Sequence, residues 1–281
     1  MVVSNANIDA AEVGRFSALA AEWWNPKGPL AVLHRLNPAR LAYIRQQCLA
    51  HFGRETAARR PFRGLKLLDI GCGGGLVAEP MARLGFSVTA VDPSAEAVEL
   101  ARTHADEARL AIDYRNGGPE ALPESGAVFD VVLALEVVEH APDARAFLTG
   151  CERLIAPGGL LILSSLNRTL RSLALGKIAA EYLLRWAPAG THDWRKFPKP
   201  AELEALLADL GLAPVTVRGL SFRPLAGVWT LTADASVNFL MTAAKPGGVS
   251  AAARPATSAR SAAARRSRAA TNRRRATSTG R

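Results

Sequence analysis

Two carboxylates and an imidazole lie within five residues in the stretch Glu136-Val-Val-Glu139-His140, and such a cluster can do chemistry in two ways. Oxygen ligands with one imidazole can hold a hard divalent cation such as Mg²⁺. Water and substrate oxygens would then complete the coordination of the cation. Alternatively, His140 can accept a proton from a phenol as a general base. A third interpretation also stays open, in which the two glutamates cap the next helix and the histidine only lines a cleft.

A second cluster surrounds a glycine-rich stretch, Asp69-Ile-Gly71-Cys-Gly73-Gly-Gly. The apolar run before it and the helical pattern after it predict a strand, a tight turn and a helix. Glycines allow positive φ angles and let a ligand approach the backbone closely. Asp92 ends the next apolar run, twenty-one residues after Gly71, where it can accept hydrogen bonds from both hydroxyls of a ribose.

The choice between cofactors rests on two differences from G-x-G-x-x-G, the pattern of dinucleotide-binding sites. Leu76 stands where that pattern has its third glycine, and Asp69 would repel a pyrophosphate. A ligand that carries an ammonium and a sulfonium tolerates this carboxylate. The stretch therefore favours S-adenosylmethionine over NAD.

Strands and helices alternate along the rest of the core. The pattern predicts helices over residues 95–108 and 144–154, and strands over 112–115, 129–135 and 160–166. Such alternation is typical of an α/β fold with a mostly parallel sheet and helices on both faces. Ligands then bind at the carboxyl ends of the strands, where Leu135 directly precedes the acidic cluster.

The first sixty residues are expected to form a helical cap ahead of this core. Trp23-Trp24 either covers a ligand or fastens the cap to the core, and the sequence does not decide between these roles. Asn37-Pro38 predicts a helix start with proline at the first position. Arg40, one turn later, either points its guanidinium at a carboxylate such as that of a methionine moiety or is solvated.

The overall charge is carried by the last segment. The chain has 281 residues and a net charge of +10, but residues 251–281 hold nine arginines and no acid, and 26 basic and 25 acidic residues remain without them. We expect residues 247–281 to be a disordered Ala/Arg-rich tail with no specific nucleic-acid partner. Three cysteines without a C-x-x-C spacing indicate a reducing compartment. Neither a signal peptide nor an apolar run of membrane-spanning length is apparent.

Together these residues resemble class I S-adenosylmethionine methyltransferases. Further stretches make the resemblance narrower, to the ubiquinone biosynthesis O-methyltransferases. They are Trp23-Trp24, residues 34–40, Glu181-Tyr-Leu-Leu-Arg185, Gly190-Thr-His-Asp193, residues 197–202 and Asp234-x-Ser-Val-Asn238. The resemblance covers roughly residues 7–246. It leaves the arginine-rich tail outside.

The resemblance implies a Rossmann-like fold with seven strands and an antiparallel last strand, over residues 237–244 of a methyltransferase domain 61–246. It also implies methylation of phenolic hydroxyls on polyprenyl catechols and demethylubiquinol. By the resemblance, Arg40, Gly71, Asp92 and Leu135 correspond to cofactor contacts, and the glycine-rich stretch itself adds Asp69 and Gly73 as candidates. By the same resemblance, Glu136, Glu139 and His140 correspond to a divalent-metal site described for eukaryotic relatives. The alternative from the residues themselves keeps His140 as the catalytic base.

The implied substrates carry a prenyl tail and reside in a bilayer. We therefore expect a cytoplasmic protein in peripheral contact with the anionic surface of the inner membrane, and in association with other enzymes of ubiquinone biosynthesis. Residues 167–200 carry an excess of basic residues together with apolar side chains. Such a segment can meet an anionic membrane, act as a lid over the active site, or do both.

Overall fold

The computed structural model describes residues 14, 17, 19–119, 122, 126–173, 197–223 and 226–247. The chain divides into two compact units, residues 1–246 and 247–281. The second unit, apart from Gly247, lies outside the described residues, and so does most of the segment 167–200 that we expect to be a lid or membrane contact.

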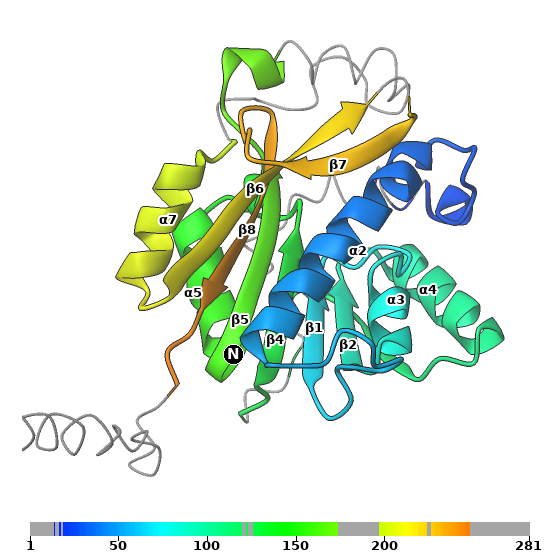
Figure 1. The fold of residues 1–281 in the computed structure, drawn as a ribbon. Coiled ribbons are helices and arrows are strands. Elements are labelled where there is room, and N and C mark those ends of the chain that lie inside the picture. The colour runs from blue at the N-terminus through cyan, green and yellow to red at the C-terminus, as the bar shows by residue number, and fades with distance from the viewer. Residues whose placement is uncertain are drawn as a thin grey trace, which may run out of the picture. The chain divides into compact units, whose positions relative to one another are not determined.

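The described residues contain one sheet with the strand order β3-β2-β1-β4-β5-β8-β6-β7 (Figure 1). The strands are β1 (Lys66–Ile70), β2 (Ser87–Asp92), β3 (Ile112–Asn116), β4 (Phe129–Leu135), β5 (Ile155–Leu166), β6 (Ala213–Arg223), β7 (Val228–Thr232) and β8 (Asn238–Ala244). The first five pair in parallel, and β8 runs antiparallel to both β5 and β6. This confirms the expected mostly parallel sheet with an antiparallel last strand.

The sheet has eight strands within the described residues, whereas seven were expected. The additional strand is β7, which pairs antiparallel with the end of β6. Its sequence, Val228-Trp-Thr-Leu-Thr232, consists largely of β-branched and aromatic residues that favour strands. Trp229 packs on Phe222 of β6 with ring centroids 5.5 Å apart, which helps to hold this edge strand in place.

Helices cover both faces of the sheet. They are the 3₁₀ turns η1 (Ala20–Glu22) and η3 (Val138–His140), and the α-helices α2 (Ala31–His51), α3 (Ala78–Arg83), α4 (Ala95–Glu107), α5 (Ala144–Leu154) and α7 (Pro200–Asp209). The apolar sides of α2, α3 and α4 share one core with the sheet, and those of α5 and α7 share the other. Neighbouring strand residues alternate between the two cores: Leu67 enters the first and Leu68 the second.

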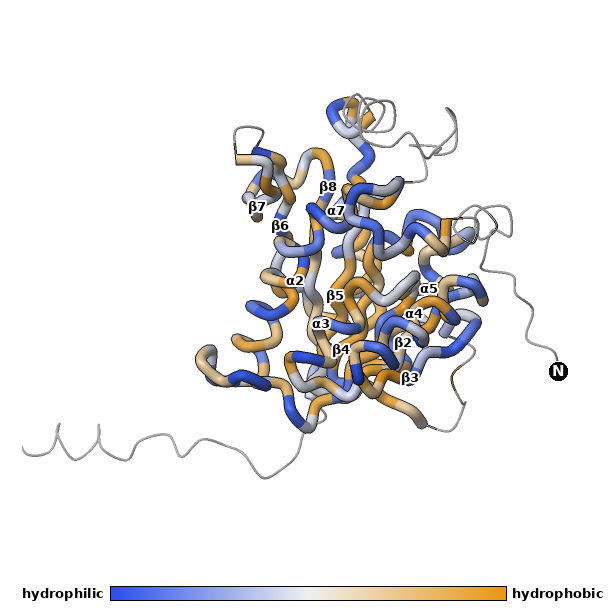
Figure 2. Tube along the Cα trace, turned by 90° about the vertical axis from the view of Figure 1, so that its right-hand side faces the viewer, coloured by the Kyte–Doolittle hydropathy of each residue, from blue (hydrophilic) through white to orange (hydrophobic). Residues whose placement is uncertain are grey.

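Hydropathy follows this layering, since the central strands are the most hydrophobic part of the trace in Figure 2. No helix within the described ranges is long and apolar enough to cross a membrane.

Helix α2 begins earlier than the sequence predicts. It starts at Ala31, so Pro38 lies inside the helix instead of at its first position. Tertiary contacts on both sides of the proline outweigh its cost to the helix. The buried Asn37 donates from Nδ2 to the Leu76 carbonyl at 2.7 Å, and Arg40 forms an ion pair with Glu136. The helix is thereby fixed to the loops that follow β1 and β4.

Candidate cofactor and active site

Apart from Arg40 of α2, the residues expected to form the site lie at the carboxyl ends of three neighbouring strands, β2, β1 and β4. The turn of residues 71–75 follows β1, Asp92 ends β2, and Leu135 ends β4 opposite Ser164 of β5. Chain order reverses between β1 and β4, and such a switch point is where open α/β sheets bind ligands. The fold therefore brings the two sequence clusters to one edge of the sheet (Figure 1).

Asp92 is held by two backbone N–H groups. Gly73 donates to its Oδ2 at 2.8 Å, and Ser94 donates to its Oδ1 at 2.9 Å. Burial raises the pKa of Asp92, and these two hydrogen bonds oppose the rise. Each carboxylate oxygen has a further lone pair, so Asp92 can accept hydrogen bonds from the hydroxyls of a ribose without losing its orientation.

Two buried groups of opposite charge each have one atom without a hydrogen-bond partner in the described part of the chain. Asp69 is 2% exposed and its Oδ2 is unpaired, while Arg40 is 6% exposed and its Nε is unpaired. Burial raises the pKa of Asp69 to about 7; the charge of Asp92 adds to the rise and that of Arg40 opposes it. Unpaired buried groups cost free energy, and a zwitterion with a carboxylate and an ammonium could satisfy both.

Arg40 also pairs through Nη2 with Oε1 of Glu136, which joins α2 to the loop after β4. Glu136 has a φ of 58°, in the left-handed region that a residue with a side chain rarely adopts. Ser164 holds this conformation: its carbonyl accepts from the Glu136 N–H at 3.0 Å, and its hydroxyl donates to Oε1 at 3.3 Å. A strained backbone fixed in this way is typical of functional sites.

Glu139 and His140 form the short turn η3. Glu139 is buried, and this burial raises the pKa of its carboxyl; the charge of Glu136 adds to the rise and that of His140 opposes it. Among the residues that the structure describes, no three His, Cys, Asp or Glu side chains are grouped to hold a metal ion. Because Arg40 already engages Glu136, the cluster as arranged does not fit a divalent cation. The metal site that the resemblance implies is left as the alternative to a general base.

The two tryptophans fasten the N-terminal segment to the glycine turn. Trp24 donates from Nε1 to the Gly74 carbonyl at 2.9 Å. A Cβ added to Gly73 would lie 1.9 Å from Cζ2 of Trp23, and one added to Gly74 would lie 2.3 Å from its Cγ. At these two positions, then, the missing side chains make room for an indole ring, a role that the sequence reasoning assigned to a ligand. A covering role for the tryptophans stays a prediction.

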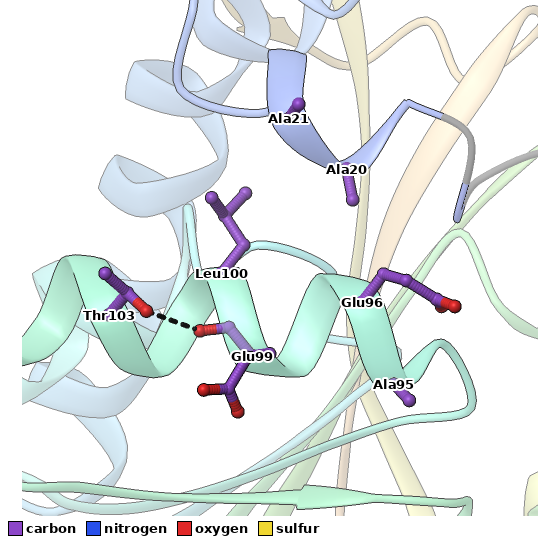
Figure 3. Close-up of a pocket in the computed structure, with 7 residues that line it drawn as sticks. All are labelled: Ala20, Ala21, Ala95, Glu96, Glu99, Leu100 and Thr103. Atoms are coloured by element: carbon purple, nitrogen blue, oxygen red, sulfur yellow. Dashed lines mark hydrogen bonds between the residues drawn. The ribbon is translucent and has the colours of Figure 1, made fainter.

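A separate pocket lies between η1 and α4 (Figure 3). It is lined by Ala20, Ala21, Ala95, Glu96, Glu99, Leu100 and Thr103. Leu100 points from α4 toward η1 in this view. None of the expected site residues lines this pocket.

Sequence reasoning missed two residues behind the glycine turn. Glu79 of α3 is 0% exposed, and His104 of α4 bonds to it through Nδ1. A single glutamate in the first turn of a helix and a single histidine in the next helix carry no pattern that links them. They become neighbours only in the folded chain, where Nδ1 of His104 meets Oε1 of Glu79.

Comparison with known sequences gives a consistent result. A family described as a methyltransferase domain matches residues 41–217. The chain is 55% identical over 240 residues to the ubiquinone biosynthesis O-methyltransferase of Caulobacter vibrioides, covering 85% of this chain and 95% of that one. It is 49% identical over 240 residues to the enzyme of the same name from Azorhizobium caulinodans, again covering 85% and 95% of the two chains.

Solved structures support the fold. Magnesium protoporphyrin IX methyltransferase from Synechocystis PCC 6803, solved with bound SAH, superposes with a TM-score of 0.57 at 21% identity, over 84% of this chain and 95% of that one. A methyltransferase of Thermotoga maritima, described as a possible histamine N-methyltransferase, gives 0.57 at 18% identity, over 83% and 99%. At these identities the likeness concerns the fold alone.

Proposed function

This chain belongs to the ubiquinone biosynthesis O-methyltransferases, which depend on S-adenosylmethionine, and from that premise we propose which hydroxyl groups it methylates and how. The acceptors are the phenolic hydroxyl of a 2-polyprenyl-6-hydroxyphenol and the corresponding hydroxyl of a 3-demethylubiquinol. The products are the methoxyphenol and ubiquinol.

The proposal for the cofactor rests on two buried charged atoms without a hydrogen-bond partner in the described part of the chain, Nε of Arg40 and Oδ2 of Asp69. Arg40 binds the carboxylate of the methionine moiety through its unpaired Nε, and Asp69 accepts from the ammonium. Asp92 accepts from the ribose hydroxyls, since it stands at the end of β2 with its orientation fixed by two N–H groups. The backbone of Gly71 and Gly73 and the side chain of Leu135 complete the binding surface.

His140 removes the proton of the phenolic hydroxyl that is to be methylated. The cofactor supplies a methyl group already activated by its sulfonium, so the protein has to align a phenolate oxygen in line with that methyl and its sulfur. A phenol titrates near pH 10 in water, which makes a nearby base necessary at neutral pH. The buried Glu139 carboxyl lies close enough to His140 for their charges to interact, and it stabilises the imidazolium that forms.

We also propose a peripheral contact with an anionic membrane surface, next to the start of the 167–200 segment. Leu170 is 77% exposed and Leu173 is 38% exposed, which is unusual for large apolar side chains. Arg168 and Arg171 are paired with Glu202 and Asp234, so the apolar side chains rather than these arginines carry this described part of the contact. Contact with other enzymes of ubiquinone biosynthesis stays a prediction.

A comparison of acceptors tests the proposed function. The purified protein is incubated with S-adenosylmethionine and a prenylated catechol, a prenylated demethylubiquinol or an unprenylated catechol, and methylated products are measured by mass spectrometry. We expect turnover of both prenylated acceptors and a lower kcat/KM for the catechol without a tail. Equal kcat/KM for the tail-less catechol would instead favour an enzyme for another small phenolic acceptor.

A further inference from the structure

A buried carboxylate behind the glycine turn takes no part in the chemistry proposed above. Glu79 is 0% exposed, and its two oxygens are held by Arg83 Nη2 at 2.8 Å and by Nδ1 of His104. Removing a partner from a buried charge is costly, because the charge then lacks both water and its counter-ion. Glu79 therefore fixes the orientation of the His104 ring.

The His104 ring in turn lies flat against Trp24. Their ring centroids are 3.6 Å apart and their planes differ by 5°. On another side, the ring of His34 meets Trp24 edge-on, with centroids 6.4 Å apart and planes at 68°. The His104 ring therefore lies nearly face to face with the indole, and the His34 ring meets it edge to face, the second being an arrangement that aromatic pairs favour beyond the burial of their area. Two histidine rings thus locate one indole.

The Trp24 indole, held in position by the two histidine rings, contacts the glycine turn directly. Trp24 donates from Nε1 to the Gly74 carbonyl at 2.9 Å, and the neighbouring Gly73 N–H donates to Asp92 at 2.8 Å. A continuous line of contacts therefore runs from Glu79 through His104 and Trp24 to the turn. Gly73, Gly74 and Gly75 bring no side chains of their own to hold the turn, so its shape depends on the groups packed against it.

We propose that His104 is a positioning residue for cofactor binding, which acts by stacking on Trp24 and thereby holds the Gly73–Gly74 turn in the shape that accepts S-adenosylmethionine. This inference rests on the proposed cofactor site. His104 itself touches neither cofactor nor acceptor. The ring stack, rather than the general stability that the Glu79 contact supplies, determines the affinity.

Two substitutions separate the effect of the ring stack on cofactor affinity from the effect of the Glu79 contact on protein stability. His104→Gln keeps a donor for Glu79 and removes the ring, whereas His104→Phe keeps a ring against Trp24 and removes the donor. For each variant, the Kd for S-adenosylmethionine is measured by titration calorimetry, Tm by scanning calorimetry, and kcat at saturating cofactor. The matched control is Glu107→Gln, an exposed residue of the same helix.

We expect His104→Gln to raise Kd about tenfold, as the loss of an aromatic pair allows, with kcat within about twofold of the native value. His104→Phe should lower Tm more than His104→Gln does, yet keep Kd within about threefold. Trp24→Phe, which retains a ring but no N–H for Gly74, should also raise Kd about tenfold. This third variant keeps the test decisive if His104→Gln does not fold.

Native affinity in a folded His104→Gln variant would overturn the proposal, and so would native affinity in Trp24→Phe. So would losses of affinity that follow the losses of Tm across the three variants, since a merely structural residue would behave in that way. Native protein that fails to bind S-adenosylmethionine at all would instead contradict the proposed cofactor site. The two failures are thus distinguishable in one experiment.

Discussion

Asp69→Asn should make the cofactor-free protein more stable and its cofactor affinity weaker. Asp69 is almost fully buried with an unpaired Oδ2, and burial raises its pKa from 3.8 to about 7. The folded state consequently binds a proton that the unfolded chain has already lost between those pH values. The ionised carboxyl therefore lowers the stability of the cofactor-free protein as pH rises through this window.

The size of this loss of stability follows from the difference between the pKa of 3.8 and the pKa of about 7. At about 1.4 kcal/mol for each tenfold change in proton affinity, ionising Asp69 in the folded state costs about 4 kcal/mol well above pH 7. The buried amide of the variant carries its own cost, of about 1–3 kcal/mol. That cost does not change with pH, whereas the cost of the carboxyl does. The advantage of Asp69→Asn should therefore grow by about 3 kcal/mol between pH 5 and pH 8.

Urea unfolding of the cofactor-free protein at pH 5, 6, 7 and 8 measures this growth, with Asp106→Asn on exposed α4 surface as the control. The same variant should bind S-adenosylmethionine about tenfold or more weakly at pH 8, because the ammonium loses a charged acceptor. A stability difference that stays constant from pH 5 to pH 8 would refute the reasoning about burial. Unchanged cofactor affinity would refute the role of Asp69 as the acceptor.

Three further substitutions test separate parts of the site. Arg40→Lys keeps the charge but not the fork that serves Glu136 and a ligand together, and calorimetry should show a Kd for S-adenosylmethionine raised about tenfold; native affinity would exclude the contact. His140→Gln should lose most methyl transfer in a radiometric assay while keeping cofactor affinity, and EDTA should leave native turnover unchanged; a loss with EDTA, restored by Mg²⁺, would return the cluster to the metal interpretation. Leu170→Gln should reduce flotation of the full chain with anionic liposomes in 0.5 M salt, about the concentration that screens the arginine-rich tail; equal flotation would place the membrane contact elsewhere.

The sequence predicted the core of the fold because its buried strands carry strong, short-range patterns. The strand 129–135 and the helix 144–154 have the predicted bounds. The sequence also placed Asp92 and Leu135 at strand ends, since parallel strands present their carboxyl ends on one edge. These predictions depend only on periodicity and connectivity.

What the sequence did not predict depends on contacts between distant residues. The start of α2 was misplaced because Pro38 is a local signal for a helix start, whereas the bonds to Leu76 and Glu136 that hold the helix are not local. The packing of the Trp23 indole on Gly73 was not predicted for the same reason, because Trp23 lies fifty residues earlier in the chain. The pairing of Arg40 with Glu136 is likewise not a local signal, because ninety-six residues separate them in the chain.

Transfer of an isotopically labelled methyl group tests the central claim most directly. The purified protein is given S-adenosylmethionine with a trideuterated methyl group and a prenylated catechol, and the acceptor is analysed by mass spectrometry and proton NMR. The account predicts one deuterated methoxy group on a ring oxygen of the prenylated catechol, with no label on ring carbon. Label on carbon, or none on the acceptor while the cofactor is bound, would contradict it.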